Sequence, residues 1–551
     1  MSNSKLVPAL FTVLKGYSKE QFFKDFISGI IVAIIALPLS IALALASGVG
    51  PEEGLYTAIV AGFLISFFGG SRVQIAGPTA AFATIVAGIV AKDGMDGLML
   101  ATIIAGILLI LMGFLKLGRL IKFIPYTITT GFTAGIAVTI VIGQIKDFLG
   151  LSYPKGTVTI ETMDKVKAIA GNIHTFNPNA LLVGLVCFAV LLIWPLIPKI
   201  GDKIPASLIA VFVGIGMVRG ANLPVNTIGD LYTISNHLPT FHLPQAITLT
   251  SLQGAATNGV TIAVLAAIES LLSCVVADSM INANHRSNME LVAQGIGNIG
   301  SAFFGGIPAT GAIARTAANI KNGGRTPIAG IVHSITLVLI LVVLMPYAAL
   351  IPMPTIAAIL FQVGYNMCGH RTFFHIVKTA PKSDIFVLVT TFVLTVVFDL
   401  VVAIAAGIVL ACILLMKRLA DEASIEGWVN YDDGKDDDDI ELKRVPDHVR
   451  VYEISGPMFF GMTDLITHVK AEENTRVFII RMRAVPALDA SAMHSLEDLY
   501  KRCQKKNIGL VFSHVNEQPM RTMVKAGFAE KLGEENFCRH IDDALERAAE
   551  F

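Results

Sequence analysis

Two ionisable residues lie inside long apolar runs of this sequence, where their side chains could do chemistry. Glu269 lies within Val264–Ser273, and Arg315 lies within Gly305–Thr316. A charge that faces lipid is costly, so each side chain is expected to face the protein interior or a water-filled cavity. Glu269 could bind and release a proton, and Arg315 could attract an anion. The two side chains could also pair with each other, and these roles do not exclude one another. Ser273, one helical turn after Glu269 on the same face, could add a hydroxyl to the cavity.

Glycine and proline interrupt the apolar pattern at two places that are alike. The first stretch is Gly69–Phe82 with Pro78, and the second is Gly305–Thr316 with Pro308. Each begins with a Gly-Gly pair, continues as an extended segment and restarts as a short helix. Two helix N-termini that face each other would present free N–H groups and positive dipole ends to an anion. Small side chains would let the anion approach these groups: Ala80, Ala81, Ala312 and Ala314. The alternative is a pair of kinked packing helices without a ligand.

The composition predicts that these residues belong to a membrane protein. The chain has 551 residues, of which 54% are hydrophobic and 15% charged, and its mean hydropathy is +0.67. Soluble globular chains have about 25% charged residues. Apolar segments of spanning length recur along the chain, and two shorter ones are interpreted as half-helices. The fourteen segments cover residues 26–46, 53–69, 78–91, 97–115, 123–145, 178–197, 205–218, 253–277, 288–304, 309–320, 326–346, 353–367, 384–398 and 400–416.

The half-helices occupy the third place in each set of seven segments, which predicts an inverted repeat. An odd number of spans per half reverses the orientation of the second half. Lys and Arg gather in alternate loops, as at Lys116, Arg119 and Lys122, and this bias predicts that both termini are cytoplasmic. No cleavable signal peptide is expected, and the six scattered cysteines fit a reducing compartment. The predicted parts are a cytosolic N-terminal segment (1–25), a transport domain (26–420), an acidic linker (421–447) and a C-terminal domain (448–551).

A set of ordered motifs resembles the signature of the sulfate permease (SulP/SLC26) family of anion transporters. These motifs are Pro38-Leu-Ser-Ile-Ala, Gly48-Val-Gly-Pro51, Gly54-Leu-Tyr56, Gly69-Gly-Ser-Arg72 and Gly77-Pro78. The resemblance implies a polytopic α-helical membrane protein with 14 transmembrane segments in a 7+7 inverted repeat, divided into a core and a scaffold. It also implies a homodimer in the lipid bilayer.

In that family the anion binds between the third and tenth helices, and the resemblance carries this site onto named residues. The implied substrate-binding residues are Thr79, Ala80, Ala81, Ala312, Ile313 and Ala314, with Arg315 beside them. The acidic position on the eighth helix, to which coupling is assigned, would be Glu269, with Ser273 next to it. Many members carry Gln and an aromatic residue where this chain has Leu39 and Leu43, so the first helix would line the site with apolar contacts only.

Within the family, the likeness is to the bacterial C4-dicarboxylic acid transporters (DauA-like). Residues 264–273, 305–319 and 485–489 carry this likeness. It implies secondary active, proton-coupled uptake of succinate, fumarate or aspartate across the inner membrane. A sulfate or bicarbonate permease or exchanger is the alternative, as is an anion channel on the same scaffold. Sodium-coupled bicarbonate members tend to carry Asp in place of Glu269 and a small residue in place of Arg315, which argues against sodium coupling here.

The polar C-terminal region is predicted to form a small α/β domain. Strands are predicted at 449–454, 477–481 and 508–513, and helices at 492–505 and 517–526. The domain resembles the cytosolic STAS fold (sulfate transporter and anti-sigma factor antagonist), which implies a cytosolic protein partner. In soluble STAS proteins the serine matching Ser491 can be phosphorylated; the alternative is a capping role for Ser491 or Asp489 at the helix start. The acidic run Asp436–Asp439 predicts a flexible tether.

Several function classes are not expected from this sequence. It contains no phosphate-binding GxxxxGK loop, which argues against an ATP-driven pump. No CxxC motif or accompanying histidine pair indicates a metal site, and the zero net charge gives no reason to expect a nucleic-acid partner. We therefore expect a transporter rather than an enzyme, without catalytic residues, metal or cofactor.

Overall fold

The structure is a computed structural model of the full chain. It describes residues 6–551 except 120–124, 155, 156, 158, 160, 199–203, 245–248, 399, 423, 429–444, 462–465, 467, 468, 470, 472 and 473. The chain divides into two compact units, Met1–Ile408 and Val409–Phe551.

Every apolar segment predicted from the sequence falls on a helix. The helices are α2 (Lys19–Ala46), α3 (Pro51–Phe68), α4 (Ala80–Phe114), α5 (Tyr126–Leu149), α7 (Pro178–Ile193), α8 (Ala206–Gly220), α10 (Leu249–Ile281), α11 (Ser287–Phe303), α12 (Ile313–Lys321), α13 (Ile328–Ala348), α14 (Met353–Cys368), α16 (Lys382–Val397) and α17 (Leu400–Asp421). Within the described residues, seven helices are long and apolar enough to cross a membrane. The remaining segments are shorter or less apolar than that criterion requires, or lie on a helix that already carries another segment.

Two boundaries differ from the prediction. The first half-helix and the next segment are joined in α4, where Gly94 breaks the helical path with φ 69° and ψ −171°. Glycine adopts this left-handed φ without a Cβ penalty. At the N-terminus, α2 begins at Lys19, so the last residues of the predicted N-terminal segment form its first turns. Short helices connect the longer ones: α1 (Ala9–Val13), α6 (Thr162–Asn172), α9 (Ile228–Leu231) and α15 (His370–Thr379).

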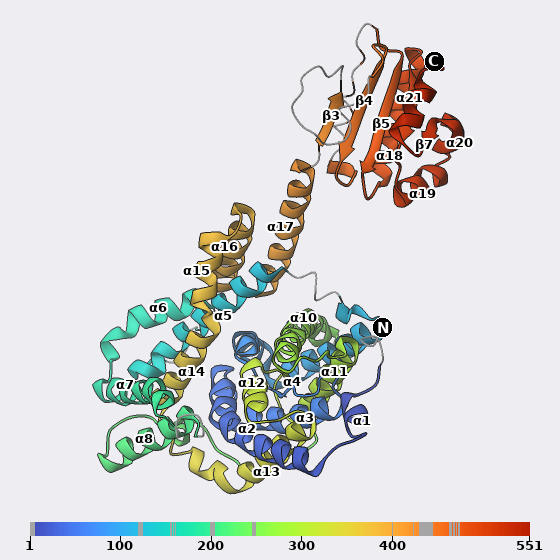
Figure 1. Ribbon diagram of the computed structural model, residues 1–551. Coiled ribbons are helices and arrows are strands. Elements are labelled where there is room, and N and C mark those ends of the chain that lie inside the picture. The colour runs from blue at the N-terminus through green and yellow to red at the C-terminus, as the bar shows by residue number, and fades with distance from the viewer. Residues whose placement is uncertain are drawn as a thin grey trace. The chain divides into compact units, whose positions relative to one another are not determined.

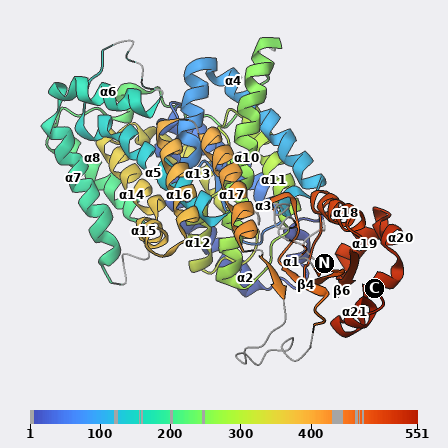
Figure 2. The same ribbon diagram turned by 90° about the horizontal axis from the view of Figure 1, so that it is seen from above.

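The helices of the first unit form two groups, which Figures 1 and 2 show from two directions. One group contains α2, α3, α4, α10, α11, α12 and α13, and in it α11 packs on α4 while α13 packs on α3. The other contains α5, α7, α8, α14 and α16, in which α5 packs on α14 and α16. Matching the first seven segments with the second seven exchanges the α4–α11 contact with the α3–α13 contact, as the inverted repeat predicts. The fold is thus the expected two-part helical membrane domain.

Small residues let the helices of the first group approach closely. Where α4 crosses α11, a Cβ added to Gly106 would lie 2.7 Å from the Gly295 carbonyl oxygen. A Cβ added to Gly295 would lie 2.4 Å from the Gly106 carbonyl oxygen. Close backbone contact of this kind replaces the hydrophobic driving force that is missing between helices in lipid.

The second unit contains a five-stranded sheet in the order β3-β4-β5-β6-β7. The strands are β3 (Ser424–Trp428), β4 (Val449–Ser455), β5 (Val477–Ala484), β6 (Gly509–Ser513) and β7 (Phe537–Cys538), and only the β3–β4 pair is antiparallel. On one face lie α18 (Ala490–Lys505), α19 (Glu517–Lys525) and α20 (Phe528–Leu532). On the other lies α21 (Ile541–Ala548), which packs on β5 and β6 (Figure 1).

The predicted strands and helices of this domain are confirmed within a few residues. The region predicted as a linker differs, because residues 424–428 form β3 and pair with residues 451–455 of β4. The segment has low hydrophobicity, and the prediction therefore missed the strand. An edge strand such as β3 pairs with one neighbouring strand only. The acidic run Asp436–Asp439 lies outside the described residues.

Candidate functional site

The two interrupted stretches cross each other in the first helix group. β1 (Ala76–Gly77) pairs antiparallel with β2 (Thr310–Gly311), with Ala76 opposite Gly311. The Ala312 N–H donates to the Ile75 carbonyl at 2.9 Å and extends this short ladder. Helix α4 begins soon after β1, and α12 begins soon after β2. Because the strands run in opposite directions, the two helix N-termini converge from opposite sides.

The first amides of both helices are open. Neither N-cap residue, Thr79 or Ala312, has a side chain that caps its helix. The Ala312 amide is used in the ladder, but the next amides have no partner among the described residues. Unsatisfied N–H donors of this kind bind anions at helix N-termini. They belong to Ala80 and Ala81 in α4, which are buried, and to Ile313 and Ala314 in α12, of which Ile313 is 41% exposed.

The Thr79 hydroxyl is turned away from its own helix toward a carboxylate. It donates to Glu269 Oε2 in α10 at 2.9 Å. Glu269 is half-buried and lies on the predicted eighth span, next to the N-terminus of the first half-helix. The predicted coupling residue is therefore in direct contact with a predicted substrate-binding residue.

Arg315 reaches from α12 across the strand crossing to the segment before α4. Its Nη2 donates to Ser40 Oγ and to the Pro78 carbonyl, both at 3.3 Å, and its side chain is almost fully buried. Its Nη1 has no partner among the described residues. A Cβ added to Gly77 would lie 2.5 Å from this Nη1, so only glycine fits here without displacing the guanidinium.

The two intramembrane charges do not pair with each other. Among the described residues, Glu269 is bonded to Thr79, whereas Arg315 is bonded to Ser40 and Pro78. Of the two interpretations that the sequence left open, this excludes a direct ion pair. It leaves a carboxylate and a guanidinium at separate places around one pair of helix N-termini.

The remaining predicted residues differ in exposure and in contacts. Ser273 is fully buried, and its hydroxyl has no partner among the described residues. Leu43 is buried and Leu39 is half-buried on α2. The first helix is not purely apolar at this point, because Ser40 between them contacts Arg315. The sequence showed Ser40 within the Pro38 motif, but its partner was visible only in the fold.

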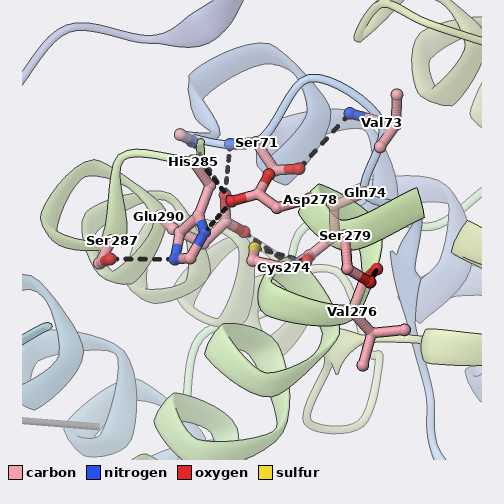
Figure 3. Close-up of polar contacts among 11 residues, drawn as sticks. Ser71, Val73, Gln74, Cys274, Val276, Asp278, Ser279, His285, Ser287 and Glu290 are labelled. Carbon is pink, nitrogen blue, oxygen red and sulfur yellow. Dashed lines mark hydrogen bonds and ion pairs between the residues drawn. The ribbon is translucent and has the colours of Figure 1, made fainter. Parts of the chain in front are cut away.

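A buried carboxylate that sequence reasoning missed anchors the first extended stretch (Figure 3). Glu290 of α11 accepts from the Gly70 and Ser71 N–H groups at 2.9 and 3.0 Å. Its other oxygen accepts from the side-chain amides of Gln74 and Gln294 at 2.8 and 2.9 Å. Four donors thus satisfy a carboxylate that has no exposed surface. The Gly-Gly pair could have indicated such an acceptor, because the backbone N–H groups of an extended buried stretch need a hydrogen-bond partner.

Neutral groups anchor the second extended stretch. Asn298 of α11 accepts from the Ala309 N–H and donates to the Ala309 carbonyl, each at 2.9 Å. The Thr57 hydroxyl of α3 accepts from the Ile307 N–H at 2.7 Å. The Ser270 hydroxyl of α10 accepts from the Gly311 N–H at 3.2 Å. Since Ser270 adjoins Glu269 in the chain, α10 touches both interrupted stretches.

A short polar relay closes the turn between α10 and α11, as Figure 3 shows. His285 Nδ1 lies 2.7 Å from Asp278 Oδ2, and His285 Nε2 lies 2.9 Å from Ser287 Oγ. The His285 N–H also donates to Asp278 at 2.7 Å. Asn282 adopts a left-handed conformation with φ 49° at the end of α10. The relay joins the helix of Glu269 to the helix of Glu290.

In the second unit, Asp489 rather than Ser491 caps α18. Its Oδ1 accepts from the Ala492 N–H at 2.8 Å, and its Oδ2 accepts from the Phe460 N–H at 3.0 Å. Ser491 is exposed in the first turn of the helix. Its position is therefore accessible to a modifying enzyme, although no contact assigns it a role.

Comparison with known proteins identifies the family. Residues 22–391 match the Sulfate permease family, and residues 439–544 match the STAS domain. A Bacillus subtilis (strain 168) protein named "Putative sulfate transporter YvdB" is 38% identical over 537 residues, covering 96% of this chain and 98% of that one. The chain belongs to the sulfate permease family.

The chain is also similar to another relative and to a solved structure. The bicarbonate transporter BicA of Synechocystis sp. (strain ATCC 27184 / PCC 6803 / Kazusa) is 31% identical, covering 95% of this chain and 94% of that one. The structure of the murine anion transporter Slc26a9 has a TM-score of 0.88 at 18% identity, covering 99% of this chain and 94% of that one. The similarity to the Slc26a9 structure shows that the two chains share a fold. Membership in the sulfate permease family makes the chain a multi-pass membrane anion transporter with a C-terminal STAS domain.

Proposed function

We propose that this sulfate permease family member is a secondary active transporter that carries a small anion together with a proton across the inner membrane. The observation that carries the proposal is the meeting of two open helix N-termini at β1 and β2, where Glu269 bonds to Thr79 and Arg315 bonds to Pro78. The free amides and the guanidinium would hold the anion. The carboxylate would hold the proton.

The coupling follows from simple electrostatics. An ionised Glu269 would repel an anion bound at the α4 N-terminus. Two unit charges about 7 Å apart, at an effective dielectric constant of about 20, interact by about 2 kcal/mol. Protonation removes this repulsion, so proton binding and anion binding strengthen each other reciprocally. Because Glu269 accepts from Thr79, the residue before α4, its protonation state bears directly on the N-terminus that would hold the anion.

The substrate we propose is a small inorganic oxyanion, sulfate or bicarbonate. The relative YvdB is named for sulfate and the relative BicA for bicarbonate. The resemblance to C4-dicarboxylic acid transporters predicts succinate, fumarate or aspartate instead, and none of the reported relatives is named for such a substrate. Competition of these anions for uptake into proteoliposomes separates the two predictions. Competition by succinate, without competition by sulfate or bicarbonate, would favour the dicarboxylate prediction.

Replacement of the proposed proton carrier tests the coupling. In proteoliposomes, Glu269→Gln should abolish accumulation driven by an inward proton gradient and retain anion exchange, since the amide cannot ionise. Asp96→Asn, an exposed carboxylate in the turn inside α4, is the matched control and should behave as wild type. An unchanged proton dependence in Glu269→Gln would remove Glu269 from the mechanism. A large anion current without concentrative uptake would instead favour an anion channel.

The assembly and orientation proposed for this chain rest on the family resemblance. We propose a homodimer with cytoplasmic N- and C-termini and a STAS domain that contacts a cytosolic partner. Ser491 is the proposed regulatory phosphorylation site, and its exposure in the first turn of α18 supports access. A phosphate on Ser491 would lie at the positive end of the α18 dipole. Mass spectrometry of the membrane protein purified from its native cells tests this modification.

A further inference from the structure

One face of the STAS sheet changes from apolar to polar at the same level in three neighbouring strands. An apolar cross-strand row on this face is covered by α21 and consists of Val451, Ile479 and Val511. The next row on the same face is polar and consists of Glu453, Arg481 and Ser513. This polar row lies toward the carboxyl ends of the three parallel strands.

The N-terminus of α21 lies at the same end of the sheet. The helix begins at Ile541, and β7 ends at Cys538, so only two residues connect them. These two residues are Arg539 and His540, and His540 is the N-cap of the helix. The polar row and the start of α21 are therefore at one edge of the domain.

Arg481 is the unusual member of this polar row. Its side chain is 5% exposed, and its Nη1 donates to Glu453 Oε2 at 3.1 Å. Its Nε is buried and has no partner among the described residues. Burying a guanidinium on a sheet face is costly unless its donors are satisfied, and one carboxylate oxygen leaves this one incomplete. An additional acceptor at this place would complete it.

Other basic side chains lie at the same strand ends. Arg483 is on the same face as Arg481, two residues further along β5, and is exposed. His514 follows β6 with φ 55°, and its ring centroid lies 5.1 Å from that of His540 at an interplanar angle of 79°. Burial, followed by the nearby charges of His540, Arg481 and Arg483, lowers the pKa of His514. Acidic groups lie here as well: Glu453 pairs with Arg481, and Asp542 and Asp543 are in the first turn of α21. Asp543 accepts from the His540 N–H at 3.2 Å.

We propose that Arg481, Arg483, His514 and His540 form a binding site for a phosphate-type oxyanion on the STAS domain. These four residues are called the strand-end site below. Arginine pairs with the oxygens of phosphate groups through several donors at once, and imidazole adds further donors. The carboxyl ends of parallel strands are where α/β domains bind ligands. The site is separate from the transport site and does not depend on which anion is transported.

Two sources could supply the same phosphate chemistry. One is a free phosphate compound in solution. The other is the headgroup of an anionic lipid, because β3 begins three residues after α17 along the chain and Ser424 pairs with Ser455 at the carboxyl end of β4. The experiment therefore varies the soluble phosphate and the lipid independently.

The test uses the full chain in nanodiscs of neutral phosphatidylcholine, with inorganic phosphate as the probe. Hydrogen exchange should show saturable protection in segments 481–484, 513–516 and 537–543 as phosphate is added. Arg483→Gln should weaken the apparent affinity by about 10-fold, since it removes one charge-assisted contact. Arg521→Gln removes the same charge from an exposed position on α19 and should leave the affinity unchanged. Phosphate binding in the transport domain would not respond to Arg483→Gln, so the two sites are distinguishable.

A second arm replaces the neutral lipid by phosphatidylglycerol without added phosphate. Protection of the same segments, lost in Arg483→Gln, would assign the strand-end site to a lipid headgroup. Arg483→Gln and His514→Gln test the proposal at positions less buried than Arg481, which both variants retain. Absence of protection in both arms, or equal affinity of wild type and Arg483→Gln, would overturn it. Arg481 and Glu453 would then be a structural ion pair only.

Discussion

The two extended stretches that precede the half-helices share a backbone plan and differ in what anchors them. The first is held by the Glu290 carboxylate, which accepts from two backbone amides and two side-chain amides. The second is held by neutral groups, chiefly the Asn298 amide and the Thr57 hydroxyl. Both Glu290 and Asn298 belong to α11. The two stretches therefore share the path of the chain and differ in the chemistry that anchors them.

The same difference appears at the helix N-termini. The N-terminus of the first half-helix contacts a carboxyl group, because its N-cap residue Thr79 donates to Glu269. The second carries a base, because Arg315 follows its first two residues and reaches back to Pro78. This asymmetric charge distribution allows proton binding to be assigned to Glu269 and anion binding to Arg315 with the helix amides. Three sets of substitutions test this contrast, in order of decreasing effect.

The largest effect is expected from Glu290→Leu. This change leaves four buried donors without an acceptor and should lower the free energy of unfolding by about 4 kcal/mol. Asn298→Leu removes two hydrogen bonds from the second stretch and should cost about 2 kcal/mol. Unfolding of the purified protein by titration with a denaturing detergent measures both values.

Glu290→Gln is the matched control for this comparison, since it keeps an acceptor oxygen and nearly the same shape. It should fall between wild type and Glu290→Leu. Equal losses in Glu290→Leu and Asn298→Leu would show that the charged and neutral anchors contribute alike, and the contrast between the two stretches would be lost.

The second effect is expected from Arg315→Gln. Loss of the guanidinium should raise the anion concentration for half-maximal uptake by about 30-fold, which corresponds to about 2 kcal/mol. Proton dependence should persist, because Glu269 is unchanged. Uptake assays in proteoliposomes measure both properties, with Arg219→Gln, an exposed arginine at the end of α8, as the control. A loss of proton dependence without a change in anion affinity would reverse the proposed division of roles.

The smallest effect is expected from Gly77→Ala. The added methyl group would lie 2.5 Å from Arg315 Nη1, so the guanidinium must shift. The anion concentration for half-maximal uptake should rise about fivefold, or by about 1 kcal/mol. In the Arg315→Gln background the same change should have little further effect, because the clash is gone. Additive effects in this double-mutant cycle would mean that Gly77 acts independently of Arg315.

The spans and the C-terminal domain were predictable because they depend on local patterns. Long apolar runs such as 328–348 must form helices in lipid, where each backbone group needs an internal partner. The Gly-Gly pairs and Pro78 marked the interruptions, and the small residues after them marked the helix N-termini. In the STAS domain, the strand at 477–484 was predictable from its apolar start, whose residues are buried.

Other parts of the site could not be predicted from local patterns. Glu290 looked like an acidic residue near the start of an ordinary helix, and its partners Gly70 and Ser71 lie more than 200 positions earlier in the chain. β3 lies in a segment whose composition is typical of a linker. Its partner β4 follows only after the acidic run in the sequence. Such contacts depend on which helices and strands become neighbours.

By itself, the sequence determined that this protein spans a membrane in two related halves with an interrupted helix in each. Hydropathy and the positions of Gly and Pro suffice for this, because the bilayer constrains every backbone group in the same way. Only the tertiary structure decided that Glu269 bonds to Thr79 while Arg315 bonds to Ser40 and Pro78. Two opposite charges in an apolar region could equally have neutralised each other. Which partner each one takes depends on the crossing of β1 and β2, which brings α10 to the start of α4 and turns the guanidinium of α12 toward α2.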